Sequence, residues 1–153
     1  MTGLYLSQLY DAIVARKAAL NVLLTGQSLT GLDQITEEPA QTARLKRPYA
    51  LVRIEGERDV EQLPMESGCY AETIPIEVEV RLDGTQSQAL KYEGIIKQGL
   101  EVSRSALVAA VTDATVSTWQ IVGSTLELDE EIENRNGWLL TIECEALIQW
   151  SST

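Results

Sequence analysis

The most informative absence in this chain of 153 residues is histidine, which does not occur at all. Without histidine the chain cannot form the Ser-His or Cys-His nucleophile pairs of many hydrolases, and it lacks the commonest ligand of zinc and iron. The sequence also lacks the phosphate-binding patterns GxGxxG and GxxxxGK[ST], the GxSxG nucleophile elbow and the HExxH zinc motif. We therefore expect a protein that is not an enzyme, with no catalytic residues, no cofactor site and no metal site.

Cysteines and long apolar runs are also scarce. Cys69 and Cys144 are the only two cysteines; their spacing is unlike that of a zinc site, and two cysteines do not make a secreted disulfide framework. No run of about 18 apolar residues occurs, and Asp11 and Arg16 introduce charge too early for a signal peptide. These features predict a reduced cytoplasmic environment during assembly and no membrane partner.

Positive charge is in short supply as well. The chain holds 12 Lys and Arg against 23 Asp and Glu, so its net charge is −11. Such a surface repels nucleic acid phosphates, which argues against a sequence-reading DNA or RNA binder. Almost all of the excess negative charge lies in residues 59–153, whereas residues 1–58 are close to neutral. This polarity suits head-to-tail contact between identical subunits, although it also serves plain solubility.

Hydrophobic periodicity predicts a single α+β domain over residues 1–153. The pattern indicates helices over 4–24 and 87–111, and strands over 50–57, 74–82, 118–129 and 138–150. We expect a two-layer sandwich in the order α-β-β-α-β-β, with a mainly antiparallel four-stranded sheet and both helices packed on one face. Two long loops are expected, over 25–48 and 58–73.

Two local features qualify this prediction. The second helix is predicted as continuous, and Gly94 is the position at which an interruption would contradict that prediction. The alternation of the third strand changes parity, so we predict a one-residue bulge near Gly123 and Ser124. The acidic segment 130–137 then predicts a hairpin turn that ends in Asn-Gly.

Strict alternation in "IPIEVEVRL" and "WLLTIECEALIQW" places apolar side chains on one sheet face and carboxylates on the other. The outward carboxylates are Glu77, Glu79, Glu143 and Glu145. One interpretation is a solvated face, with Arg53 and Arg81 as cross-strand partners of these groups. The other is a cluster that binds Mg²⁺ or Ca²⁺ or acts as an acid/base pair.

The one basic cluster of the sequence closes the first long loop. It consists of Arg44, Lys46 and Arg47. A loop of this length inside a compact domain is often functional, so we consider an arm that docks on an acidic neighbour as well as a solvated linker. The candidate acidic counterpart is the charged hairpin region, with Glu127, Asp129, Glu130 and Glu131.

The order of elements resembles the phage tail terminator family, also called tail completion or minor tail protein U-like proteins. The resemblance rests on the amphipathic N-terminal helix, the long link into "RPYALVRI", the strand "IPIEVEVRL", a helix and the closing "WLLTIECEALIQW". It covers nearly the whole chain as an order of elements and carries no diagnostic residue motif. Related neck and stopper proteins look similar at this level.

This resemblance implies a structural virion protein of the tail or neck, assembled in the host cytoplasm. Such proteins form a homo-oligomeric ring, usually of six subunits, on the head-proximal end of the tail tube. Its partners are the tail tube protein and the head-tail connector or stopper protein, and DNA passes through its lumen without sequence recognition. Glu77, Glu79, Glu143 and Glu145 are the candidate lumen-facing residues. The alternative is a small α+β protein that binds a ligand or cation, or a carboxylate hydrolase.

Overall fold

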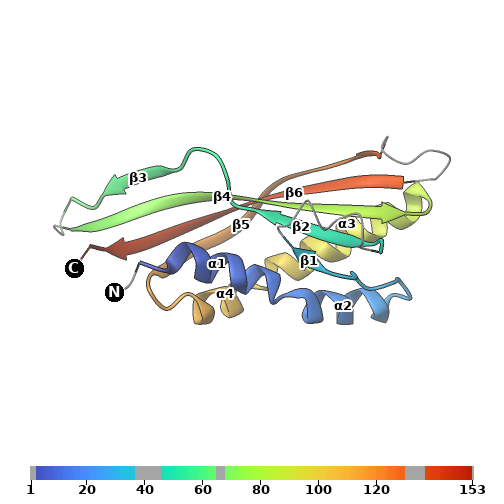
Figure 1. The fold of residues 1–153 in the computed structure, drawn as a ribbon, viewed down its shortest axis with the longest axis horizontal. Helices are drawn as coiled ribbons and strands as arrows, with labels where there is room; N and C mark the ends of the chain where they lie inside the picture. Colours follow the sequence, from blue (N-terminus) through green and yellow to red (C-terminus); the bar gives the residue numbers. More distant parts are fainter. Residues whose placement is uncertain (1–2, 37–45, 65–67, 130–136, 153) are drawn as a thin grey trace.

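The computed structural model describes residues 3–36, 46–64, 68–129 and 137–152. It has two layers: a sheet of long strands, and a layer of helices that lies against one face of that sheet (Figure 1). This confirms the predicted α+β class and the placement of all helices on one face. The sheet face that carries no helices is called the outer face below.

In the described residues, the helical layer contains twice the expected number of helices. It consists of α1 (Tyr5–Val14), α2 (Lys17–Gly26), α3 (Gln86–Glu101) and α4 (Arg104–Ala110). Each predicted helix is therefore divided, and the second one breaks after Glu101, not near Gly94. No helix in the described part of the chain is long and apolar enough to cross a membrane.

The two helix breaks are tied to each other. The Ser103 hydroxyl donates to the carbonyl of Gly99 at 2.7 Å, and it accepts from Nε of Arg16 at 2.8 Å. Arg16 lies at the α1–α2 break and Ser103 at the α3–α4 break, so one buried hydroxyl joins both. Neither break contains the Pro or Gly that marks most helix ends. For this reason the hydrophobic pattern predicted one continuous helix across each break.

Glycine has opposite roles at two positions of α3. At Gly99 an added Cβ would lie 2.4 Å from Cδ2 of Leu20, so only glycine allows α2 to approach α3 so closely. At Gly94 an added Cβ would meet nothing within 4 Å. The helix begins with a capping box in which Thr85 accepts from the backbone N–H of Gln88.

The sheet contains the four expected strands and two short additional ones. In chain order they are β1 (Ile35–Thr36), β2 (Tyr49–Arg53), β3 (Asp59–Gln62), β4 (Cys69–Asp83), β5 (Thr115–Leu128) and β6 (Gly137–Ser151). The spatial order is β1-β2-β4-β6-β5, with β3 beside the first half of β4. All pairs are antiparallel except β1 with β2.

Three predicted boundaries are corrected by this topology. The loop predicted over 25–48 contains β1, and the loop predicted over 58–73 contains β3 and the start of β4. These strands are too short, or too rich in charge, to show a clear period of two. The strand predicted over 50–57 ends at Arg53, because the chain turns at Gly56 with φ +95°.

The bulge predicted near Gly123 is confirmed within one residue. The register of β5 on β6 shifts between Ile121 and Gly123, and a second shift lies between Val116 and Thr118. The two shifts leave a regular stretch, Thr118–Ile121, between them. The predicted hairpin turn lies mainly in 130–136, outside the described residues.

The core lies between the helices and the inner faces of β4 and β6. The alternating residues predicted to face inward are buried there: Ile74, Ile76, Val78, Val80, Leu82, Leu140, Ile142, Cys144, Ala146 and Ile148. Burial raises the pKa of Cys144 to about 12, so its thiol stays protonated and packs as a small apolar group. Trp119 is 5% exposed and donates its indole N–H to the carbonyl of Leu100.

Candidate functional site

The outer face carries two groups of charged side chains with different character. Side chains of β4 supply both groups, because Glu77, Glu79 and Arg81 alternate with the buried valines of that strand. At one end, acids and arginines alternate in a chain of ion pairs, which we call the ion ladder (Arg47, Asp129, Arg81, Glu79 and Arg53). At the other end is the acidic patch (Glu55, Glu77, Glu143 and Glu145).

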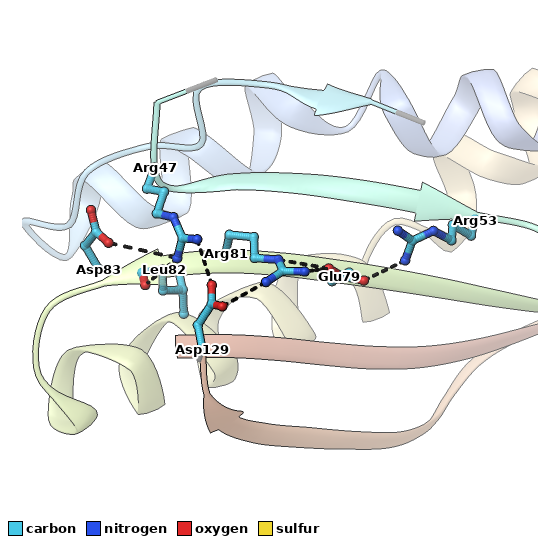
Figure 2. Close-up of polar contacts among 7 residues, drawn as sticks. All are labelled: Arg47, Arg53, Glu79, Arg81, Leu82, Asp83 and Asp129. Atoms are coloured by element: carbon cyan, nitrogen blue, oxygen red, sulfur yellow. Dashed lines mark hydrogen bonds and ion pairs between the residues drawn. The ribbon is translucent and has the colours of Figure 1, made fainter. Parts of the chain in front are cut away.

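The ion ladder is continuous along β4, from Arg47, which precedes β2, to Arg53, which ends β2 (Figure 2). Asp129 lies between two arginines, with its carboxylate oxygens 2.7 Å from Arg47 and 3.0 Å from Arg81. Arg81 also reaches Glu79 at 2.7 Å, and Glu79 reaches Arg53 at 2.6 Å. Each inner member thus contacts an opposite charge on both sides, which offsets the cost of removing it from water.

The ladder lies in the covered part of the outer face. The side chain of Asp129 is 1% exposed and that of Glu79 is 9% exposed, whereas the arginines retain more contact with solvent. Tyr49 and Leu51, on the same face of β2, are also buried. The ladder is therefore a buried network, and its geometry fixes one side chain against the next.

The protonation of the ladder arginines is reinforced by their partners. A hydrogen bond to Glu79 is the main cause that raises the pKa of Arg53. Burial alone would lower the pKa of Arg81, but the hydrogen bonds and charges of Asp129 and Glu79 outweigh it and raise that pKa. Both side chains remain cationic at any physiological pH.

The ladder contains two residues that the sequence placed at a subunit interface. Arg47 and Asp129 lie 82 positions apart in the sequence, yet within one chain their side chains form an ion pair at 2.7 Å. Lys46 and Glu127 are exposed, and Asp83 is a peripheral partner of Arg47 at 4.0 Å. The remaining predicted interface residues, Arg44, Glu130 and Glu131, lie outside the described residues.

The acidic patch surrounds a hollow of about 340 Å³ on the outer face. Glu77 on β4 stands directly opposite Glu143 on β6, and Glu145 is opposite Pro75. Although Arg53 is the cross-strand neighbour of Glu77, its guanidinium contacts Glu79. Within the described residues no cation lies within ion-pair distance of Glu77, Glu143 or Glu145.

The pKa of Glu77 reflects its burial and the crowding of carboxylates around it. Its pKa is raised, first by burial and then by the neighbouring carboxylates of Glu79, Glu55 and Glu143, while the charge of Arg53 opposes the change. Like charges held this close disfavour the ionised form. Of the four carboxylates predicted to face a lumen, three therefore lie in the acidic patch without an ion-pair partner, and the fourth, Glu79, belongs to the ladder; Arg53 also lines the hollow.

The patch does not have the arrangement of a cation site. Among residues 3–36, 46–64, 68–129 and 137–152, no group of three or more Asp, Glu, Cys or His side chains is placed to hold a metal ion. What the arrangement provides instead is a negative surface on a rigid sheet. Such a surface repels polyanions through their phosphates.

A further polar cluster on the inner face was missed by sequence reasoning. Glu72 is 4% exposed, and its Oε2 accepts from the hydroxyl of Tyr5 at 2.5 Å and from the indole N–H of Trp150 at 3.0 Å. The ring of Trp150 stacks on those of Tyr5 and Tyr70. Glu72 shares the parity of Ile74, which would have placed it inward had the strand been predicted to begin earlier.

Comparison with known proteins gives information on the fold only. No protein-family model and no curated protein sequence matches the chain. A similar solved structure is a chain of the "Virion of native gene transfer agent (GTA) particle", with a TM-score of 0.50 and 13% sequence identity. The match covers 92% of this chain and 91% of that chain, so the likeness extends over the whole two-layer fold.

Proposed function

We propose that this chain is a structural virion protein that forms a ring at the head-proximal end of a phage tail. The observation that carries the proposal is the likeness, over almost the full length of both chains, to a component of a gene transfer agent virion. The order of elements and the acidic outer face support the same interpretation. The ring ends tail tube polymerisation and provides the surface to which the head is joined.

The partners in this proposal follow from the place of the ring. Copies of this chain contact one another around the ring, the tail tube protein lies below it, and a connector or stopper protein lies above it. Closed rings arise when each subunit presents two different surfaces, one to each neighbour. The uneven charge of the sequence, nearly neutral in residues 1–58 and strongly acidic in 59–153, is compatible with such unlike surfaces.

The acidic patch is the proposed lining of the lumen. DNA that passes through the ring should not adhere to its wall, and a wall in which four carboxylates surround one arginine meets that requirement. Glu77, Glu143 and Glu145 supply this charge, whereas the charge of Glu79 is neutralised by Arg81 and Arg53. The ladder instead has a structural role, because it ties β2 and the residue after β5 to β4.

The functional test is electron microscopy of particles made by a host in which the gene for this chain is inactivated. The proposal predicts tail tubes of uncontrolled length and heads without tails, and both defects should be corrected by the intact gene supplied in trans. Tails of normal length joined to heads would contradict the proposal. A variant with Gly94→Ala, which adds a methyl group into open space, is the control that should restore normal particles.

The basic arm offers a second test at the level of the subunit interface. We expect that Lys46→Glu combined with Arg44→Glu weakens ring formation while the monomer remains folded. Arg47 must be left unchanged, because its guanidinium is 2.7 Å from Asp129 and its loss would disturb the fold. Rings of normal size and stability from the double variant would exclude the arm as a contact.

A further inference from the structure

The outer edge of β5 is an open strand edge. In the described part of the chain β5 is the last strand of its sheet and pairs only with β6. Alternate backbone N–H and C=O groups along an edge strand point away from the sheet and can pair with another strand. The edge is covered at one point, because the guanidinium of Arg104 donates to the carbonyl of Ser117.

The composition of this edge favours pairing. Residues 115–126 contain no charged residue and no proline, and they include three threonines and two valines. Natural proteins usually protect exposed edges with charged side chains, proline, β-bulges or a covering segment. β5 carries two bulges, and the regular stretch Thr118–Ile121 lies between them.

A second open edge lies on the other side of the sheet. β3 spans Asp59–Gln62, all four of its residues are exposed, and among the described residues it pairs only with β4. It lies near one end of the long axis, beside the first half of β4 (Figure 1).

We propose that Thr118–Ile121 of one copy pairs with β3 of the next copy, and that this strand pairing is the contact that joins neighbours in the ring. The inference rests on the proposed function for the identity of the partner, which is a second copy of this chain. The strand directions fit, because β3 and β6 run the same way and each is antiparallel to β4. The β5 strand of one copy and the β3 strand of the next therefore meet antiparallel, like the other long pairs.

The two faces of the strands also match. Val60 pairs with Glu72, so it lies on the inner face, where it is 52% exposed; the inner face of β5 offers the partly buried Ile121. On the outer face, Asp59 and Glu61 would lie beside the polar residues Thr118 and Gln120. Apolar groups thus meet apolar groups and acids meet hydrogen-bond donors.

Charge disfavours the symmetrical alternative at β3. Two β3 strands from different copies would bring four carboxylates together, from Asp59 and Glu61 of each. Pairing of β5 with β3 avoids this repulsion and leaves both edges covered. It also joins the outer faces of neighbouring copies into one surface, on which Asp59 and Glu61 extend the acidic patch.

Directed disulfide formation tests the pairing. Opposed residues of antiparallel strands have Cα atoms about 4.5–5.5 Å apart, which lies within the range of a disulfide. In a Cys69→Ser background, two single variants are prepared, Gln120→Cys and Glu61→Cys, both at exposed positions. On mild oxidation the mixture should give the mixed dimer several-fold more than either homodimer. The pair Gln120→Cys and Asp59→Cys covers the neighbouring register.

A matched control guards against random collision. Leu90→Cys is as exposed as the test sites but lies on α3, in the helical layer, and it should not cross-link with Glu61→Cys. Predominant Gln120→Cys homodimers would overturn the proposal in favour of two-fold β5 pairing. Failure of both register pairs to cross-link above the Leu90→Cys control would also overturn it.

A single chain that carries both Gln120→Cys and Glu61→Cys separates this inference from the proposed function. Cross-linked products that stop at one size and appear as rings support both. Products that continue into open filaments support the strand pairing and contradict the ring. Rings of the unmodified chain without cross-linking at either register contradict the strand pairing and leave the ring standing, and the absence of both rings and cross-links overturns both.

Discussion

The two ends of the outer face use the same residue types in opposite ways. In the ion ladder, Asp129 and Glu79 each contact arginines on two sides and are almost completely buried. In the acidic patch, Glu77 faces Glu143 across two strands, and the nearest arginine is turned toward the ladder. Cross-strand position alone therefore does not decide whether a carboxylate is neutralised; the direction taken by Arg53 does.

This difference separates stability from surface charge. A buried charge that loses its partner is costly, so the ladder should tolerate little change. Carboxylates crowded at a solvent-accessible surface repel one another, so the patch should cost the monomer some stability. Retaining such a patch is consistent with a use for the negative surface beyond the monomer, and the proposed lumen provides one.

The largest expected effect is that of Asp129→Asn. The change leaves Arg47 and Arg81, whose side chains are 14% and 15% exposed, without their shared carboxylate. We expect the free energy of unfolding to fall by about 3 kcal/mol. Urea denaturation followed by tryptophan fluorescence measures it. The matched control is Asp83→Asn, because Asp83 lies 4.0 Å from Arg47 and is half exposed; its effect should stay within about 0.5 kcal/mol. Equal losses in both variants would contradict the buried role of the ladder.

Glu79→Gln should have the next largest effect. Its carboxylate joins Arg81 to Arg53, and Arg53 is 28% exposed and can regain water when the partner is lost. We expect a loss of about 2 kcal/mol in the free energy of unfolding. Calorimetric melting of Glu79→Gln beside Glu143→Gln compares the ladder and the patch directly. Stabilisation by Glu79→Gln would place this residue in the patch instead.

Glu77→Gln should have the opposite sign and depend on pH. The pKa of Glu77 is raised above 4.5 in the folded chain, so the folded state binds a proton more readily than the unfolded state. The associated stability is present below the unfolded pKa and is lost as pH rises through the folded pKa. At neutral pH the Gln variant should therefore be more stable, by up to about 1 kcal/mol. Melting temperatures of both proteins should converge as the pH is lowered toward about 4.5.

A change in salt concentration should produce the smallest effect, and it should distinguish the acidic patch from the ion ladder. Screening acts on solvent-exposed charges, and the Debye length falls to about 3 Å at 1 M salt. The gain from Glu77→Gln should shrink at high salt, while the loss from Asp129→Asn should persist because its partners are buried. Denaturation curves at low and high NaCl concentration provide the comparison. A loss for Asp129→Asn that disappears in salt would indicate that the ladder is solvated.

The sequence pattern was informative where a period continued over many residues. The inward faces of β4 and β6 and the bulge near Gly123 were predicted from alternation alone, because each side chain's environment there depends on its parity. The breaks at Arg16 and Ser103 were not, since those residues are compatible with helix and the bond that joins them links distant positions. β1 and β3 were missed because strands of two and four residues carry almost no periodic signal.

The candidate site was predictable in composition but not in pairing. Parity placed Glu77, Glu79, Glu143 and Glu145 on one face, and the structure confirms their shared face. It could not reveal that Glu79 joins the arginines while Glu77 does not, because that choice depends on side-chain conformation. The contact of Arg47 with Asp129 joins the residues that precede β2 to those that follow β5, and it has no local sequence signal.

The most direct test of the account is the solution mass of the purified chain over a concentration series, with negative-stain images of the same samples. We predict a single closed ring with a central hole, of about six subunits as the resemblance to tail terminators implies. The mass should be unaffected by Mg²⁺. A chain that remains monomeric at every concentration, or that forms only open filaments, would contradict the central claim.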